Sequence, residues 1–95
     1  MTSRTTDRFW QSYNSLPIEI KKKAKKAFQL FQKEPSYPGL HFKRIHSSKP
    51  VYSIRITKNY RALGAVQDEE IIWFWIGSHS DYDKMIKATR EDKSL

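Results

Sequence analysis

The chain has 95 residues, a length that allows one small domain and leaves no room for a second domain or a repeat array. Its content of 38% hydrophobic and 14% aromatic residues is typical of a compact globule and excludes disorder over most of the length. A net charge of +8, most of it in residues 1–48, favours an anionic partner such as nucleic acid, an anionic membrane or an acidic protein.

Two amphipathic helices are predicted in the first third of the chain. Residues 5–7 offer cap residues for a first helix, which ends near Ser15, and Pro17 is well suited to start a second helix. The second helix ends before Pro35, because proline disfavours helical backbone in the residue before it. Its many lysines most simply form a solvated face, with a specific nucleic-acid surface as the alternative: Lys21, Lys22, Lys23, Lys25, Lys26 and Lys33.

Four short β-type runs follow, at 41–46, 51–56, 60–66 and 71–77. The gaps between them are short enough for hairpins, so an antiparallel meander is predicted. The last run is apolar on both faces, which predicts the most buried strand and a central place in the sheet. Ser80 and Asp83 resemble a capping box that opens a final helical turn around 82–88, and 89–95 are predicted to form a frayed tail.

These elements predict one α+β domain spanning 1–95, with its core in about 5–88. Two N-terminal helices pack on one face of a four-stranded antiparallel sheet, and a short helical turn follows the last strand.

Two arginines in the predicted central hairpin are candidate phosphate ligands. If the loop is 57–59 with Asn59 in the left-handed conformation, then Arg55 lies opposite Arg61. Like charges directly opposed in a sheet are unfavourable, so an anion such as a phosphate is expected between them. Alternatively, one arginine stacks on a tryptophan or pairs with a nearby aspartate. The other face of the hairpin then forms a core layer against the helices: Tyr52, Ile54, Ile56, Ala62 and Val66.

His79 follows the buried strand at a position that reaches solvent while the strand holds it in place. A histidine can move a proton near neutral pH, Tyr82 can donate a hydrogen bond or a proton, and Arg61 can hold a phosphoryl oxygen. Together these three suffice for RNA cleavage without a metal ion, in which the 2′-hydroxyl attacks its own phosphodiester. The simpler alternative is a loop histidine beside a helix cap and a packing tyrosine.

Three further cations flank the predicted sheet. Lys43, Arg44 and Lys49 can extend a basic groove beside Arg55 and Arg61 that binds RNA phosphates. No cofactor is expected, because the chain has no cysteine, no glycine-rich phosphate loop and no metal-ligand spacing among its three histidines. The absence of cysteine suits the cytoplasm, and neither a membrane span nor a signal peptide is expected.

Residues 16–86 resemble the RelE/ParE superfamily of bacterial toxins. The resemblance rests on the order of elements, on the segment from Tyr52 to Gly64 with its paired arginines, and on the late sequence Ile76-Gly-Ser-His79 followed by Tyr82. It implies the toxin of a type II toxin–antitoxin system, inactivated by an acidic antitoxin. In RelE-like and YoeB-like members the activity is mRNA cleavage, generally at the ribosome.

The resemblance places the catalytic residues of such an endoribonuclease at Arg61, His79 and Tyr82, with Lys43, Arg44 and Arg55 as phosphate ligands. ParE-like members share the fold but poison DNA gyrase. Two functions therefore stay open: a metal-free mRNA endoribonuclease, or a non-catalytic binding module. In the enzyme, Arg55, Arg61 and His79 should share one solvent-open face.

Overall fold

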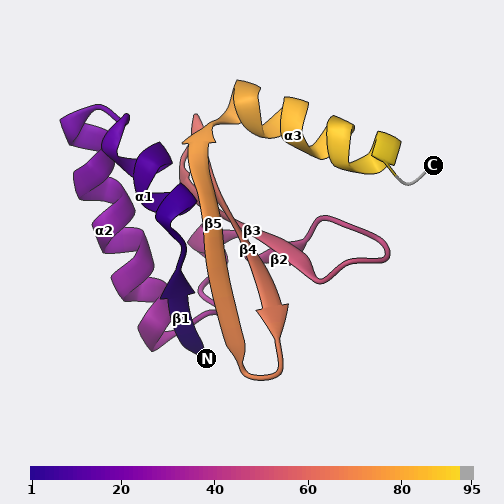
Figure 1. Ribbon diagram of the computed structural model, residues 1–95. Helices are drawn as coiled ribbons and strands as arrows, with labels where there is room; N and C mark the ends of the chain where they lie inside the picture. Colours follow the sequence, from indigo (N-terminus) through magenta and orange to yellow (C-terminus); the bar gives the residue numbers. More distant parts are fainter. Residues whose placement is uncertain (93–95) are drawn as a thin grey trace.

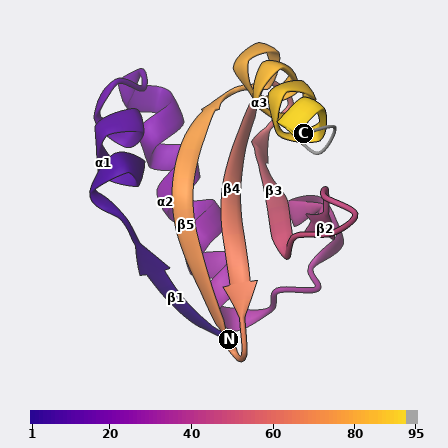
Figure 2. The ribbon, with the colours of Figure 1, turned by 45° about the vertical axis from the view of Figure 1, so that its right-hand side comes forward.

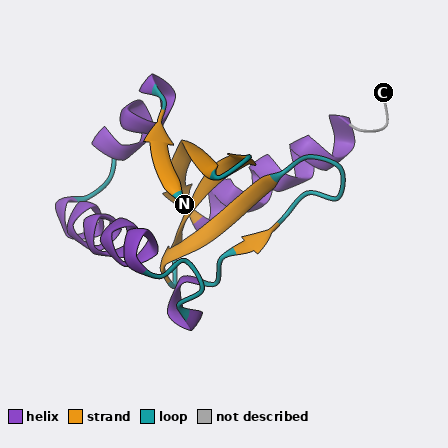
Figure 3. Cartoon of the chain, turned by 90° about the horizontal axis from the view of Figure 1, so that it is seen from below, coloured by secondary structure: helices purple, strands orange, loops and turns teal. Residues whose placement is uncertain are grey.

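The computed structural model describes residues 1–92 and has an α+β fold, as predicted (Figure 1). Two helices, α1 and α2, lie against one face of a sheet, and a third, α3, lies at its other face (Figure 3). In chain order the elements are β1 (Thr2–Thr5), α1 (Asp7–Asn14), α2 (Ile18–Lys33), the 3₁₀ turn η1 (Pro38–Leu40), β2 (Lys43–Arg44), β3 (Val51–Thr57), β4 (Tyr60–Gln67), β5 (Glu70–Ser78) and α3 (His79–Asp92).

The sheet has five strands in the order β1-β5-β4-β3-β2, one more than predicted. The additional strand, β1, runs parallel to β5, whereas the other pairs are antiparallel (Figure 2). Its sequence is polar and shows no alternation, so only its pairing with β5, reinforced by contact between Arg4 and Glu70, makes it a strand. As predicted, β5 is an interior strand, because β1 and β4 flank it, although β4 is the middle strand of the five.

The core lies between the sheet and the first two helices. Thr6 starts α1 by accepting a hydrogen bond from the Phe9 N–H at 3.1 Å, and Phe9 is buried. Phe31 of α2 packs edge-on against Trp73 of β5, with their ring centroids 5.3 Å apart. The predicted core layer of the hairpin is confirmed, since Ile54 and Ala62 are buried in this core and Tyr52, Ile56 and Val66 pack against it.

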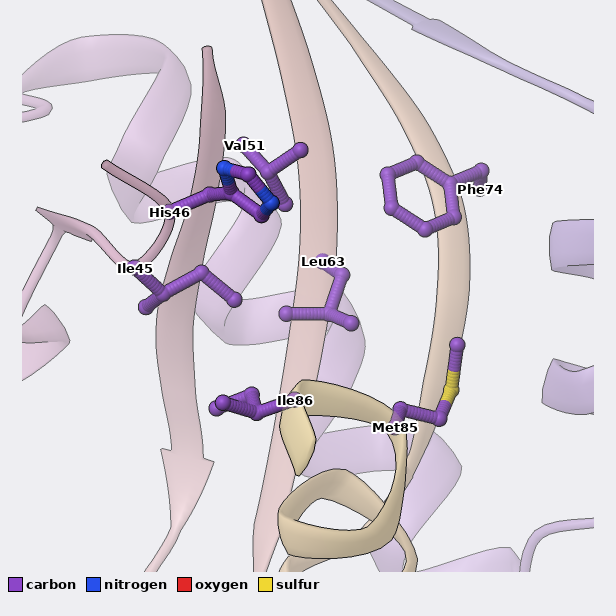
Figure 4. Close-up of a pocket in the computed structure, with 7 residues that line it drawn as sticks. All are labelled: Ile45, His46, Val51, Leu63, Phe74, Met85 and Ile86. Atoms are coloured by element: carbon purple, nitrogen blue, oxygen red, sulfur yellow. The ribbon is translucent and has the colours of Figure 1, made fainter. Parts of the chain in front are cut away.

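A bulge in β5 explains why its sequence is apolar on both faces. Leu63 pairs with Trp75 and Gly64 with Trp73, which leaves Phe74 as an extra residue in β5. Trp73 therefore belongs to the helix-covered core, and Phe74 belongs to the other face. There it lines a cavity of about 50 Å³ beneath α3 (Figure 4), together with Ile45, His46, Val51, Leu63, Met85 and Ile86.

Two elements differ in length from their predictions. The predicted strand 41–46 is reduced to Lys43–Arg44, and His41 has left-handed backbone with φ of 48°. The last helix begins at His79 and reaches Asp92, so it takes in four residues of the predicted tail, while 93–95 lie outside the described residues. Ser78, rather than Ser80, accepts from the backbone N–H three residues on, at 3.2 Å. Within 1–92 no helix is long and apolar enough to cross a bilayer.

Candidate active site at the start of helix α3

Arg55, Arg61 and Gly77 form one row across three neighbouring strands. Arg55 of β3 is the register partner of Arg61 of β4, and Arg61 is in turn the partner of Gly77 of β5. Because register partners project to the same face of a sheet, the two arginines lie on one side. The His79 N–H donates to the carbonyl of Asn59 at 2.7 Å, which joins the start of α3 to the β3–β4 turn at this end of the sheet.

The predicted pairing of Arg55 with Arg61 is confirmed, but the predicted turn is wrong. The loop has two residues, Lys58 and Asn59, and Asn59 does not adopt a positive φ. Thr57 pairs with Tyr60, which leaves Ile56 as a bulge. A two-residue loop with one bulged residue uses as much chain as a three-residue loop, so both give the same register at the arginines.

The guanidinium of Arg61 is held against the hairpin turn. Its Nη1 donates to the carbonyl oxygens of Thr57 at 2.7 Å and Tyr60 at 3.0 Å. Burial, and secondarily the charge of Arg55, lower the pKa of Arg61, while Tyr82 and Asp83 act in the opposite direction. The charged form is therefore costly in the folded protein, and a bound anion would offset that cost.

His79 and Asp83 form a pair on the first turn of α3. Nδ1 of His79 lies 3.2 Å from Oδ2 of Asp83, and 45% of the histidine side chain is exposed. An imidazole that donates its Nδ1–H to the carboxylate keeps Nε2 as the proton acceptor. From the sequence, Asp83 is expected to cap the last helix or to pair with an arginine, and its pairing with His79 is not predicted. Its separation of four residues from His79 is a signal for this pair once both are placed on a helix.

Tyr82 is buried beneath this pair. Only 6% of the residue is exposed, and its hydroxyl donates to Ser53 Oγ of β3 at 3.5 Å. Its ring centroid is 5.6 Å from that of His79. The structure therefore places Tyr82 next to the imidazole, with its hydroxyl joining α3 to the sheet.

The three flanking cations do not all reach this face. Lys43 is the register partner of Ser53, so it projects to the side of Arg55 and Arg61. Arg44 pairs with Tyr52 of the core face, and its Nε donates to the carbonyl of His46 at 2.9 Å. Lys49 lies in the exposed loop before β3, where its backbone N–H donates to Nδ1 of His46 at 3.0 Å.

Gly77 and Trp75 are features of the site that sequence reasoning missed. A Cβ atom at position 77 would lie 2.5 Å from Cζ2 of Trp75, so the indole occupies the space that a side chain would need. Glycine is therefore required for close approach, and the half-buried indole lies beside the arginine row. Among the described residues, no group of three or more His, Asp or Glu side chains is arranged to hold a metal ion.

Comparison with known proteins gives a family match and a set of similar structures. Residues 19–84 match the family model described as the ParE-like toxin domain. No curated protein sequence matches the chain.

Three of the similar structures cover most of both chains. The RelB-RelE antitoxin-toxin complex of Methanococcus jannaschii contains a chain that is 25% identical, with a TM-score of 0.70 over 85% of this chain and 96% of that chain. The toxin-antitoxin complex RelBE2 of Mycobacterium tuberculosis gives 22% identity and a TM-score of 0.66, covering 82% and 96%. The YoeB/ParE toxin of Agrobacterium tumefaciens gives 15% identity and a TM-score of 0.66, covering 83% and 99%.

Proposed function

The chain belongs to the family of ParE-like toxin domains, and from this premise we propose that it is the toxin of a toxin–antitoxin pair that cleaves mRNA at or near the ribosome without a metal ion. The observation that carries the proposal is that two opposed arginines and a histidine paired with Asp83 lie at the same end of the sheet. Anion binding and proton transfer are the two functions that RNA cleavage through the 2′-hydroxyl requires.

In the proposed reaction the phosphodiester lies over the arginine row. Nε2 of His79 accepts the proton of the 2′-hydroxyl while the 2′-oxygen attacks phosphorus and the bond from phosphorus to the 5′-oxygen breaks. The leaving 5′-oxygen takes a proton from water, and the protonated His79 returns its proton to the hydroxide that remains. The products are a 2′,3′-cyclic phosphate and a 5′-hydroxyl. Arg61, and beside it Arg55, stabilise the negative charge that grows on the phosphoryl oxygens.

Asp83 and Tyr82 act as positioning residues in this scheme. Asp83 lies within hydrogen-bonding distance of Nδ1 and stabilises the imidazolium that forms when His79 takes the proton. Tyr82 is buried, and its hydrogen bond to Ser53 fixes the position of α3 relative to the sheet. Because His79 belongs to the same helix, this contact also fixes the position of the imidazole. Lys43 extends the cationic surface along the same face, whereas Arg44 and Lys49 contribute to the field around it.

We assign the antitoxin contact to an aromatic groove between α1, α2 and β1. The groove has a volume of about 590 Å³, and its lining includes Phe9, Trp10, Tyr13 and Phe28, with Lys25 at its border. Rings of this kind are favoured anchors of protein interfaces, and Trp10 is 45% exposed. An antitoxin segment with apolar side chains and acidic flanks matches both the rings and the charge of Lys25. Two of the similar structures are toxin–antitoxin complexes.

The experiment that tests the nuclease is induced expression in bacteria, with growth and new mRNA 5′ ends as readouts. The wild type is compared with Arg61→Ala and His79→Ala, and circular dichroism establishes that each variant folds. Arg8→Ala, an exposed arginine on α1, is the matched control. Arg61→Lys, which keeps a charge but loses the forked donors, should show intermediate activity.

We expect growth arrest with new 5′ ends in the wild type and in Arg8→Ala, and neither in the alanine variants of the site. Arrest without cleavage would replace the nuclease by a non-catalytic binding module, such as a gyrase inhibitor. Cleavage that survives both alanine substitutions would overturn the assigned residues.

A further inference from the structure

A second basic surface lies at the edge of the sheet formed by β3, next to the row that contains Arg55 and Arg61. A groove of about 300 Å³ runs between α2, η1 and β3, and its lining includes Lys23, Lys26, Tyr37, Gly39 and Arg55. This volume is within the range of about 300 to 1,000 Å³ usual for small-ligand pockets. The groove is open to solvent because, within residues 1–92, β2 pairs only with Tyr52 and Ser53. In that range no strand lies beside the edge of β3 beyond Ser53.

The lining of the groove carries positive charges that are not paired with carboxylates of the described residues. Its cations come from two elements, with Lys23 and Lys26 one turn apart on α2 and Arg55 on β3. None of the described residues that line it is acidic. In the part of the chain whose side chains are described, no ion pair joins these three cations to a carboxylate, whereas their neighbour Lys22 lies 3.8 Å from Glu19. Three cationic residues that line one hollow favour a phosphate there.

Tyr37 gives the groove an aromatic wall. The residue is 38% exposed, and a Cβ atom at position 39 would lie 3.8 Å from its Cε2, so Gly39 runs alongside the ring and adds no side chain there. The ring also borders a second hollow of about 470 Å³ that is lined in part by His41 and Phe42. An exposed ring beside a cluster of cations is the arrangement with which proteins hold single-stranded nucleic acid, because every base has a face that can stack.

Arg55 belongs both to this groove and to the proposed cleavage site. It lines the groove at the edge of β3, and it is the register partner of Arg61. We propose that the groove binds the nucleotide next to the cleaved linkage of a single-stranded RNA, with its phosphate among Lys23, Lys26 and Arg55 and its base on Tyr37. This assignment rests on the proposed function and adds a binding subsite to it.

The test compares two double substitutions on the same helix. Lys23→Ala with Lys26→Ala removes two of the three groove cations. Lys22→Ala with Lys33→Ala removes the same charge from two exposed positions of α2 that lie outside the groove lining. Alanine is the best helix former, so both variants should fold. The primary readout is the rate of mRNA cleavage in a bacterial translation extract, which contains ribosomes. The second is binding of a short uncleavable 2′-O-methyl RNA as a function of salt.

We expect the groove variant to lose about tenfold or more in cleavage rate and the control to change little. In the binding readout, loss of the one phosphate contact in the groove should lower the salt slope of RNA binding by about 0.7. Tyr37→Ala should weaken binding by about fivefold or more, whereas Tyr37→Phe, which retains the ring, should not.

The outcomes separate failure of the subsite from failure of the function. Equal losses in the two lysine variants, or no loss in either, with an active wild type would overturn the subsite and leave the nuclease intact. A wild type that neither cleaves mRNA in the extract nor binds the RNA probe would overturn both the proposed function and the subsite.

Discussion

Arg55 and Arg61 are direct register partners in the β3–β4 ladder, two like charges on one face of a sheet. Their opposition is unfavourable by about 0.2 to 1 kcal/mol compared with a neutral pair. Arg61 cannot swing freely away from it, because its Nη1 is bound to the carbonyls of the hairpin turn. Burial and the charge of Arg55 lower the pKa of Arg61. The repulsion between Arg55 and Arg61 thus lowers the stability of the free protein, and a phosphate bound between them would restore it.

Arg55→Gln should stabilise the free protein and weaken its function. Removing the second charge should raise the pKa of Arg61 toward its ordinary value and increase the free energy of unfolding by about 0.2 to 1 kcal/mol. Urea denaturation measures the stability, and the RNA cleavage assay measures the loss of activity. Inorganic phosphate should raise the melting temperature of the wild type more than that of the variant. An equal rise in both would mean that Arg55 takes no part in binding the anion.

Asp83→Asn should lower the cleavage rate without unfolding the protein. The amide keeps the size of the side chain but removes the carboxylate that lies 3.2 Å from Nδ1 of His79 and favours its Nδ1–H form. We expect a loss of about 10- to 100-fold in kcat with little change in KM, because the carboxylate acts on proton transfer and not on RNA binding. Asp81→Asn on the same turn is the matched control. A change in KM alone would contradict the positioning role.

Tyr82→Phe tests whether the Tyr82 hydroxyl stabilises the fold or takes part in the reaction. The variant retains the buried ring and loses only the hydrogen bond to Ser53 Oγ, so the expected loss of stability is about 0.5 to 1.5 kcal/mol. Activity should remain within about tenfold of the wild type, because the hydroxyl is buried and away from solvent. Melting temperature and initial cleavage rates measure the two effects. A loss of activity far beyond tenfold at unchanged stability would instead assign the hydroxyl to the reaction itself.

Gly64→Ala tests how tightly β4 packs against β5. A Cβ atom at position 64 would lie 2.7 Å from Cγ1 of Ile71 and 2.8 Å from Cε3 of Trp73, both of which are fully buried. We expect a loss of about 1 to 3 kcal/mol in the free energy of unfolding, the usual effect of overpacking. Gly39→Ala is the matched control, since its Cβ would meet only an ordinary contact with Tyr37 at 3.8 Å. Equal unfolding midpoints for the two variants would show that the strands adjust without strain.

Trp10→Ala should weaken antitoxin binding without affecting RNA cleavage by the free toxin. The indole borders the aromatic groove, and its Nε1 donates to Thr5 Oγ1 at 2.9 Å, which holds the ring at the rim. Loss of such an anchor typically costs 2 kcal/mol or more, or about 30-fold in affinity. Titration calorimetry with the cognate antitoxin measures the change, and Ile18→Ala, an exposed apolar side chain of α2 outside the groove lining, is the control. Unchanged affinity would remove the groove from the interface.

Short-range patterns account for the parts of the fold that were predicted well. Helical spacing and Pro17 placed α1 and α2 to within about two residues, and the turn chemistry around Asn59 placed Arg55 opposite Arg61 even though the turn itself differs. Both features depend on residues that are close in the sequence. The strand β1 escaped prediction because its four polar residues have no pattern of their own and pair with residues nearly seventy positions away.

The sequence by itself determined a basic α+β domain, the arginine pair and the position of His79 just after a buried strand. Only the tertiary structure decided that Asp83 pairs with His79, that Tyr82 is buried against Ser53, and that Arg55 shares a groove with Lys23 and Lys26. The physical reason is that these contacts depend on where α3 begins and on which face of the sheet each helix packs. The placement of the helices is set by burial of apolar surface over the whole chain, so it cannot be predicted from any short segment of the sequence.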